Sequence, residues 1–264
     1  MAALTKIVTA SPNRIFTLSH FCELFGTAKS TMSEDIDILK DVLSRFELGR
    51  LDTVTGAAGG VRFRPSMGRA EAQALIAGLC RELMQPSRLL PGGFLYLSDI
   101  LSEPSLVRGM GVILAEQFYD TAPDFVLTME TKGIPVALMT ADALGVPLVI
   151  ARRVGRAYEG SAVNITYVTG AADRIETMSL SRRAVKAGQR ALIVDDFLKG
   201  GGTARGMADL MREFAVEVVG MGFVMATVSP AQKRIRGEKS LMVMDVDPSA
   251  PETLTVRPAS WLND

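Results

Sequence analysis

Two adjacent carboxylates and a glycine-rich stretch stand together in the segment Val-Asp-Asp-Phe-Leu-Lys-Gly-Gly-Gly-Thr, residues 194–203. The apolar run Ala191–Val194 predicts a buried strand, and the residues from Thr203 onward predict a helix. Glycines let a backbone turn tightly, so the N–H groups of residues 199–203 can point toward one phosphate at the start of that helix. Asp195 and Asp196 would repel a phosphate, and their natural partners are vicinal hydroxyls or a divalent cation. The segment therefore predicts a site for a ribose 5-phosphate with free hydroxyls.

Two other phosphate-binding motifs are excluded at this segment. The pattern GxxxxGK[ST] is absent, and the acids precede the glycines, which is the reverse of the dinucleotide-binding fingerprint. The alternative interpretation is a structural strand–turn–helix with surface acids. Two aspartates at the end of a buried strand need a partner, and this favours the binding site.

A second strand end carries related chemistry. The strand predicted at Phe125–Met129 is followed by Glu130-Thr131-Lys132-Gly133 and then by a helix predicted at Ile134–Leu144. A lysine and a helix N-terminus after a glycine turn suit a pyrophosphate, although an ordinary strand–helix turn is the alternative.

Positive charge gathers in the next part of the chain. Arg152 follows the strand predicted at residues 147–151, on the expected ligand side, and residues 151–190 hold eight Lys/Arg against three acids. This segment predicts an anion-attracting surface that includes Arg182 and Arg183, or alternatively a solvated basic face. Residues 154–162 are predicted to form a mobile loop.

These loops need a sheet to position them. Apolar runs alternate with helical patterns from about residue 125 onward, with further strands predicted at 163–169, 175–180, 216–226 and 241–246 and a helix at 203–214. Continuous apolar strands between helices indicate an α/β domain with a mostly parallel sheet. Ligands bind such sheets at the carboxyl ends of the strands, where the acids and glycines fall.

The first 65 residues have a different pattern. A short helix is predicted at residues 18–25 and ends at Gly26. A second helix begins near Lys29, and Thr31 with Glu34 is predicted to form a capping box. Alternating apolar and polar residues at 51–55 and 61–64 then flank a glycine-rich tip. Helix, tight turn, helix and hairpin form a winged helix-turn-helix domain. The side chains predicted to contact DNA are Lys29, Ser30, Thr31 and Ser33 on the second helix and Arg62 and Arg64 on the wing. A small helical dimerisation domain is the alternative.

Length and composition limit the classes of protein to which the chain can belong. The 264 residues suffice for about two domains, predicted here at 1–70 and 71–264. The formal net charge is +0, so DNA contact must come from a local patch. Two distant cysteines exclude a disulfide scaffold, and a single histidine excludes a multi-histidine metal site; no direct metal ligand set is predicted. No signal peptide or membrane-spanning run is recognised, and a cytoplasmic protein is expected.

The segment Asp195–Thr203 resembles the phosphoribosyl pyrophosphate (PRPP) motif of type I phosphoribosyltransferases, and Glu130–Gly133 resembles their pyrophosphate loop. That resemblance covers roughly residues 85–250. With TKGIPVA, the run from Tyr167 to Ser181 and DDFLKGGGT, the whole chain resembles the purine operon repressors of Gram-positive bacteria. One departure is Gly200, which stands where those repressors usually have alanine; an extra glycine should loosen the loop.

The resemblance implies a homodimeric repressor that binds operator DNA upstream of purine biosynthesis genes and is released by PRPP, which enters with Mg²⁺. It implies that Asp195 and Asp196 hold the ribose hydroxyls, that Lys199, Gly200, Gly201, Gly202 and Thr203 hold the 5-phosphate, and that Thr131, Lys132 and Gly133 hold the pyrophosphate. An active purine phosphoribosyltransferase with an appended domain is the alternative. The short, proline-marked stretch after Asp247 is expected to lack room for a base-binding hood, which favours a repressor without turnover.

Two phosphate subsites on either side of a ribose site also suit another ligand. A purine nucleotide with phosphates at both ends, such as guanosine tetraphosphate, could compete with PRPP. Phe197 follows the acid pair and could stack on its base, or could serve only in packing.

Overall fold

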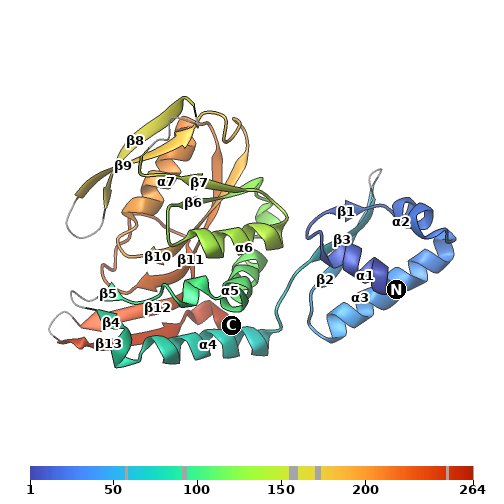
Figure 1. Ribbon diagram of the computed structural model, residues 1–264, viewed down its shortest axis with the longest axis horizontal. Coiled ribbons are helices and arrows are strands. Elements are labelled where there is room, and N and C mark those ends of the chain that lie inside the picture. Colours follow the sequence, from blue (N-terminus) through green and yellow to red (C-terminus); the bar gives the residue numbers. More distant parts are fainter. Residues whose placement is uncertain (57–58, 91–93, 155–159, 170–173, 248–249, 264) are drawn as a thin grey trace.

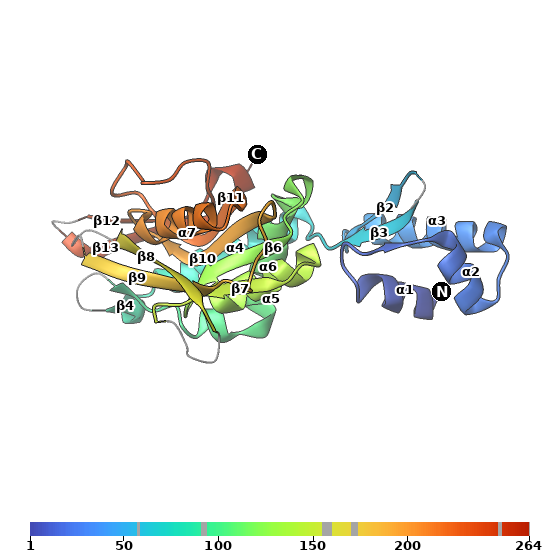
Figure 2. The ribbon, with the colours of Figure 1, turned by 90° about the horizontal axis from the view of Figure 1, so that it is seen from above.

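The chain folds into two lobes, which lie end to end along the long axis of the molecule (Figures 1 and 2). The computed structural model describes all residues except 57–58, 91–93, 155–159, 170–173, 248–249 and 264. The predicted mobile loop at 154–162 and the glycine-rich wing tip therefore fall partly outside the described residues. Each lobe has its own hydrophobic core, and residues 65–68 connect the two.

The amino-terminal lobe is a winged helix. Its helices are α1 (Ala2–Thr9), α2 (Leu18–Phe25) and α3 (Lys29–Arg45), and β1 (Ile15–Phe16), β2 (Arg50–Val54) and β3 (Gly60–Arg64) form a sheet in the order β1-β3-β2. The Thr17 hydroxyl accepts the His20 N–H at the start of α2, and Gly26 ends α2 in a left-handed conformation with φ of 62°. The capping box predicted at Thr31 is wrong, because α3 begins two residues earlier, with Ala28 at its N-cap.

The carboxy-terminal lobe contains a sheet in the order β13-β12-β11-β10-β6-β7. Its strands are β6 (Phe125–Met129), β7 (Leu148–Ala151), β10 (Arg190–Leu198), β11 (Glu217–Thr227), β12 (Lys239–Asp247) and β13 (Ala250–Pro258). Neighbouring strands are parallel except β12 and β13, which confirms the prediction of a mostly parallel sheet.

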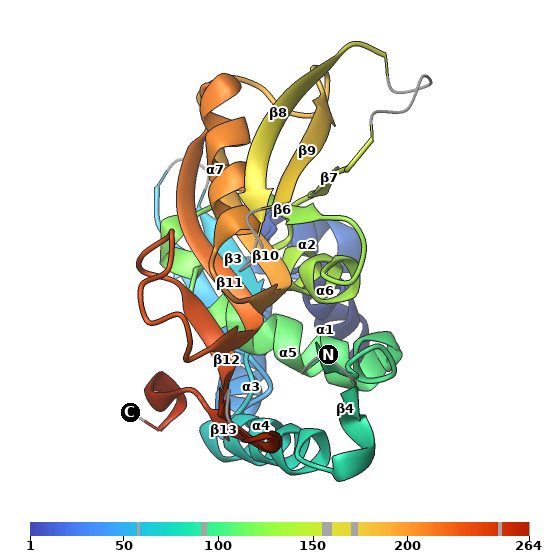
Figure 3. The ribbon, with the colours of Figure 1, turned by 90° about the vertical axis from the view of Figure 1, so that its left-hand side faces the viewer.

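Helices cover both faces of this sheet. One face packs on α4 (Arg69–Leu83), α5 (Pro104–Glu116) and α6 (Ile134–Leu144), and Figure 3 shows α4 alongside β13. The other face packs on α7 (Gly202–Glu213) and on the hairpin of β8 (Ala162–Thr169) and β9 (Arg174–Ser181). Shorter elements are β4 (Leu89–Leu90), β5 (Phe94–Leu95) and 3₁₀ turns at Pro86–Arg88, Ile100–Ser102, Tyr119–Thr121 and Ser260–Leu262.

Two parts of the sheet differ from the sequence prediction. Strand β10 continues through Asp195, Asp196 and Phe197 to Leu198, so the acids lie within its last residues rather than after it. The stretch after Asp247, expected to be a short tail, forms the edge strand β13 and a 3₁₀ turn whose Leu262 joins the main core. The length of this stretch therefore gives no argument against a base-binding hood.

The two cores mark where one lobe ends and the other begins. The core of the winged helix extends as far as Phe63, and the main core of the second lobe begins at Ala72. The boundary predicted at residue 70 falls inside the first turn of α4.

Candidate functional site

A pair of buried carboxyl groups lies at the carboxyl end of the central strand β10. Asp195 is 8% exposed, and its Oδ1 accepts the backbone N–H of Asp196 at 3.0 Å. Burial raises the pKa of the Asp195 carboxyl well above its usual range, and the negative charge of Asp196 raises it further. Burial also raises the pKa of Asp196, while the positive charge of Lys132 is among the influences that lower it. Both ionised forms are thus disfavoured, and a ligand that brings hydroxyl donors or a cation would relieve this cost.

The glycine-rich loop forms a cradle beside the acid pair. Residues 199–203 line a cavity of about 180 Å³ together with Asp195, Phe197 and Phe223. Gly201 takes the left-handed φ of 79°, and α7 begins at the next residue, so its unpaired N–H groups lie at the loop. Gly202 packs so tightly under the β8–β9 hairpin that a Cβ there would lie 2.1 Å from the Val168 carbonyl oxygen. Asp195 and the start of α7 therefore border one anion-sized cavity.

The second predicted anion loop meets the acid pair. Gly133, at the N-cap of α6, lies so close to Asp195 that an added Cβ would be 2.0 Å from its Oδ1. The Oγ1 of Thr128 is buried beside Gly133 with no hydrogen-bond partner among the described residues, so an unsatisfied polar atom lies where this loop meets Asp195. The charge of Lys132 reaches Asp196. The structure thus brings Lys132 and Gly133 to the acids, as the strand-end argument predicts.

Arg152 lies at the base of the same loop. Its Nη1 donates to Glu130 Oε2 at 3.4 Å, and Glu130 Oε1 accepts the Arg153 N–H at 2.7 Å. The Glu130 carboxylate therefore joins the end of β7 to the loop before α6. In this arrangement the guanidinium of Arg152 supports the loop through Glu130.

One element of the site was missed in the sequence. Residues 228–238 connect β11 to β12 and lie against the cradle, where the Arg234 N–H donates to Gly200 O at 3.0 Å and Arg234 Nη1 donates to Val168 O at 3.3 Å. Arg234 thereby joins the cradle to the β8–β9 hairpin. The run Lys-Arg-Ile-Arg after a strand end was a usable signal, because this connection lies at the ligand edge of the sheet.

The predicted DNA-contacting residues divide into two groups. Lys29, Ser30, Thr31 and Ser33 are exposed on the first turns of α3, whose opposite face packs into the lobe. On the wing, Arg62 is half-buried, and its Nη2 lies 3.9 Å from Asp52 Oδ2.

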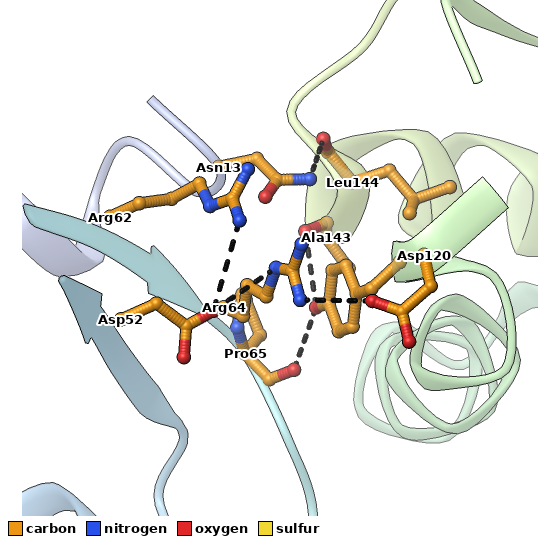
Figure 4. Close-up of polar contacts among 9 residues, drawn as sticks. Asn13, Asp52, Arg62, Arg64, Pro65, Asp120, Ala143 and Leu144 are labelled. Atoms are coloured by element: carbon orange, nitrogen blue, oxygen red, sulfur yellow. Dashed lines mark hydrogen bonds and ion pairs between the residues drawn. The ribbon is translucent and has the colours of Figure 1, made fainter. Parts of the chain in front are cut away.

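Arg64 lies elsewhere than predicted. It is 9% exposed, and its guanidinium faces the second lobe, with Nε 3.3 Å from Asp52 Oδ2, Nη1 3.4 Å from Asp120 Oδ1 and the charge 5.0 Å from the Tyr119 ring centre (Figure 4). Its side chain is therefore part of the contact between lobes and is not presented on the surface of the wing.

Comparison with known proteins agrees with this architecture. Residues 1–65 match the model described as "Bacterial purine repressor, N-terminal", and residues 97–249 match the phosphoribosyl transferase domain. The fold resembles that of adenine phosphoribosyltransferase from Saccharomyces cerevisiae, with a TM-score of 0.53, 22% identity and coverage of 63% of this chain and 97% of that one. The fold and site define a winged helix joined to a type I phosphoribosyltransferase domain.

Full-length relatives identify the family. The probable purine biosynthesis transcriptional regulator PurR of Streptococcus pneumoniae is 43% identical over 94% of this chain and 90% of its own. The purine biosynthesis transcriptional repressor PurR of Bacillus subtilis is 39% identical (98% and 91%), and the activator PurR of Lactococcus lactis is 36% identical (98% and 96%). The chain belongs to this family of purine biosynthesis transcriptional regulators.

The described residues lack two features that would indicate other classes of protein. No helix there is both long and apolar enough to cross a membrane. No cluster of three or more His, Cys, Asp and Glu side chains is placed there to hold a metal ion.

Proposed function

We propose that this regulator acts as a cytoplasmic homodimer that represses purine biosynthesis genes by binding double-stranded operator DNA and releases that DNA when PRPP binds. The observation that carries the proposal is the meeting of two anion loops at one buried acid pair. A ligand with a phosphate, a ribose and a pyrophosphate matches these three features in order.

The parts of PRPP would be distributed as follows. Asp195 and Asp196 accept hydrogen bonds from the ribose 2- and 3-hydroxyls, and the start of α7 holds the 5-phosphate with Lys199 and Thr203. The pyrophosphate lies at Thr131–Gly133, where Lys132 adds a positive charge. Mg²⁺ enters with the pyrophosphate, since the acid pair and the phosphate oxygens are the hard oxygen donors that it prefers.

The winged helix supplies the DNA-binding surface. The exposed start of α3 would enter the major groove with Lys29, Ser30, Thr31 and Ser33, and Arg62 would approach the backbone from the wing. Each bound molecule disfavours the other by linkage, with a coupling of about 5–150-fold in affinity.

A gel-shift experiment tests this function. Operator DNA from a purine gene is titrated with the full chain at moderate salt, with and without Mg²⁺–PRPP, and with the Asp195→Ala/Asp196→Ala variant. We expect the wild type to release DNA on addition of PRPP and the variant to bind DNA but ignore PRPP. Failure of the wild type to bind any such DNA at moderate salt would overturn the proposal.

The direction of regulation needs its own experiment, because relatives in the family carry the names repressor and activator. Transcription of an operator-linked reporter in vitro measures it: repression lowers transcript on addition of protein, and PRPP restores it. A rise of transcript on addition of protein would make this chain an activator.

An active purine phosphoribosyltransferase is a second candidate, because the acid pair and the cradle of the transferase fold are both present. Catalysis of this kind depends on positioning and on shelter for a developing cation, so no single nucleophile decides it. Incubation with Mg²⁺–PRPP and adenine, guanine, hypoxanthine or xanthine decides between the two. If none of these bases is converted, the proposal of an active enzyme is rejected.

A nucleotide phosphorylated at both ends, such as guanosine tetraphosphate, also matches the two anion loops. Phe197 lines the cavity but is also packed against the main core, so only part of its ring is available to a base. Calorimetric titration with PRPP in the presence of guanosine tetraphosphate measures competition. An unchanged PRPP affinity would eliminate this ligand.

A further inference from the structure

Helix α6 connects two places that matter for regulation. Its first residue, Ile134, follows the anion loop at Gly133, and its last residue, Leu144, is followed by Gly145 at the contact between lobes. Eleven residues at 1.5 Å each span about 16 Å. Along this length α6 is held tightly against α5, since a Cβ on Gly111 would lie 2.6 Å from Met139 Cβ. Close packing of this kind leaves the helix little room to bend, so a displacement of its start would be passed to its end.

The far end of α6 is bound by the winged helix. Asn13 Nδ2 donates to the Leu144 carbonyl oxygen at 2.7 Å, a bond visible in Figure 4. A Cβ on Gly145 would lie 2.1 Å from the Pro12 carbonyl oxygen, so the two backbones are in direct contact. The Asn13 N–H in turn donates to Phe63 O at 2.7 Å, which ties this contact to the wing strand β3.

Tyr119 forms a second bond between the same elements. Its hydroxyl lies 2.7 Å from the Pro65 carbonyl oxygen, in the segment that connects the lobes, and 3.3 Å from the Ala143 carbonyl oxygen in the last turn of α6. The Arg64 guanidinium lies over the ring of Tyr119. One phenol therefore contacts the connector, the wing strand and α6.

The contact between lobes is polar and incompletely filled. Beside it lies a cavity of about 650 Å³, lined from the first lobe by Ser44, Glu47 and Arg50 and from the second by Glu116, Lys239 and Trp261, among others. Interfaces of this polar kind permit relative motion of domains, whereas a dry, packed interface would hold them fixed. Specific polar contacts, among them the hydrogen bonds of Asn13 and Tyr119, therefore link the lobes.

We propose that Asn13 and Tyr119 are positioning residues that transmit occupancy of the anion loop at Gly133 through α6 to the winged helix. The inference rests on the proposed function. Pyrophosphate bound at residues 131–133 displaces the start of α6 from its close contact with Asp195. The helix passes this displacement to the carbonyl groups of Ala143 and Leu144 in its last turn. The hydrogen bonds of Tyr119 and Asn13 carry this shift to the connector and to β3. Helix α3, which would enter the major groove of DNA, then changes its orientation together with β3.

The test measures coupling separately from binding. Asn13→Ala and Tyr119→Phe are compared with two control variants. The controls are Asn164→Ala, on an exposed position of β8, and Tyr96→Phe, at a residue that is 43% exposed. Calorimetry gives PRPP affinity without DNA, and gel shift gives operator affinity with and without PRPP. We expect both separate affinities to stay within about threefold of wild type in every variant. The PRPP effect on DNA affinity, about 5–150-fold in wild type, should fall below about threefold only in Asn13→Ala and Tyr119→Phe.

The outcomes separate the two hypotheses. If PRPP does not change the operator affinity of the wild type, the proposed function is contradicted. If PRPP lowers the operator affinity of the wild type and lowers that of the Asn13→Ala and Tyr119→Phe variants equally, only the inference is overturned. If these variants do not fold, hydrogen exchange on the wild type decides. PRPP should change the exchange rates of the Asn13 and Val146 amides, which bond to Phe63 O and Ala141 O, by at least threefold. Unchanged rates at both would overturn the inference.

Discussion

Two regions of this molecule remove charge from water, and they do so in opposite ways. At the end of β10, burial disfavours the ionised forms of Asp195 and Asp196. Between the lobes, Arg64 is equally buried, but Asp52, Asp120 and the face of Tyr119 surround its guanidinium. A buried charge with oppositely charged partners is typical of a structural contact. A buried carboxyl pair whose ionised forms lack such partners is typical of a binding site.

The largest effect is expected from neutralising the acid pair. Asp195→Asn/Asp196→Asn removes both negative charges and replaces one acceptor oxygen of each side chain by an NH₂ donor. PRPP binding should weaken at least about 100-fold, since each hydrogen bond to a charged group contributes about 1.5–3 kcal/mol. The same change should raise the free energy of unfolding by about 1–2 kcal/mol, because a disfavoured buried charge is lost. Calorimetry and thermal denaturation measure the two effects.

Asp209→Asn is the matched control for that prediction. Its carboxylate is paired with Arg205 and Arg212 on α7, so its removal should leave PRPP affinity unchanged and should not stabilise the protein. Loss of stability in the Asp195→Asn/Asp196→Asn variant would show that the acid pair is compensated after all, and the contrast between the two regions would disappear.

The compensated region gives the next largest effect. Arg64→Met should lower the free energy of unfolding by about 1–3 kcal/mol, because it removes two ion pairs and a cation–π contact from a buried position. Arg62→Met, on the same strand but half-buried and 3.9 Å from Asp52, should cost less than about 1 kcal/mol. Urea denaturation of both variants compares them, and equal losses would contradict the structural role given to Arg64.

Solvent-exposed arginines are a third case, beside the buried acid pair and the buried Arg64. Arg182 and Arg183 are exposed on the connection after β9, and Arg182→Glu/Arg183→Glu should weaken operator binding about tenfold and reduce the slope of log affinity against log salt by about one or two. Arg205→Glu is the control, since it reverses one charge on α7, where no DNA contact is proposed. A salt slope that stays the same in the Arg182→Glu/Arg183→Glu variant would place DNA away from this surface.

The last effect is a dependence on pH. Because the folded chain binds a proton at Asp195 more tightly than the unfolded chain does, lowering the pH from 7 toward the usual aspartate pKa of about 3.9 should stabilise the wild type relative to Asp195→Asn/Asp196→Asn. The change is at most about 1.4 kcal/mol per pH unit for one proton. PRPP affinity should fall over the same range, since PRPP needs ionised acids. Denaturation and calorimetry at pH 7, 6 and 5 measure these opposite trends, and parallel trends would contradict them.

Much of the architecture was predictable because it depends on local patterns. The alternation of apolar strands and helices predicted the parallel sheet, and the helix at Ile134–Leu144 has the predicted bounds. The edge strand β13 was missed because Pro251 and Pro258 argue against a strand, although an edge position tolerates proline. Strand β10 is longer than predicted because Asp195 and Phe197 still pair with the neighbouring strand β11, and the apolar pattern alone does not reveal this pairing.

The errors at the site have a common physical cause. Alternation along β3 places Arg62 and Arg64 on one face of the wing, but no local pattern tells whether water or a second lobe covers that face. The connection carrying Arg234 was missed for the same reason, since its contact with Gly200 joins residues far apart in sequence. Local periodicity predicts elements, whereas contacts between distant segments require the fold.

The separate cores and the short connector at residues 65–68 have an evolutionary consequence. A phosphoribosyltransferase fold and a winged helix that each fold around their own interior can be recombined by gene fusion without redesign of either interior. Only the few side chains where they touch, such as Asn13, Arg64 and Tyr119, must then adapt to one another. New genes can come under the control of an old metabolite by this route.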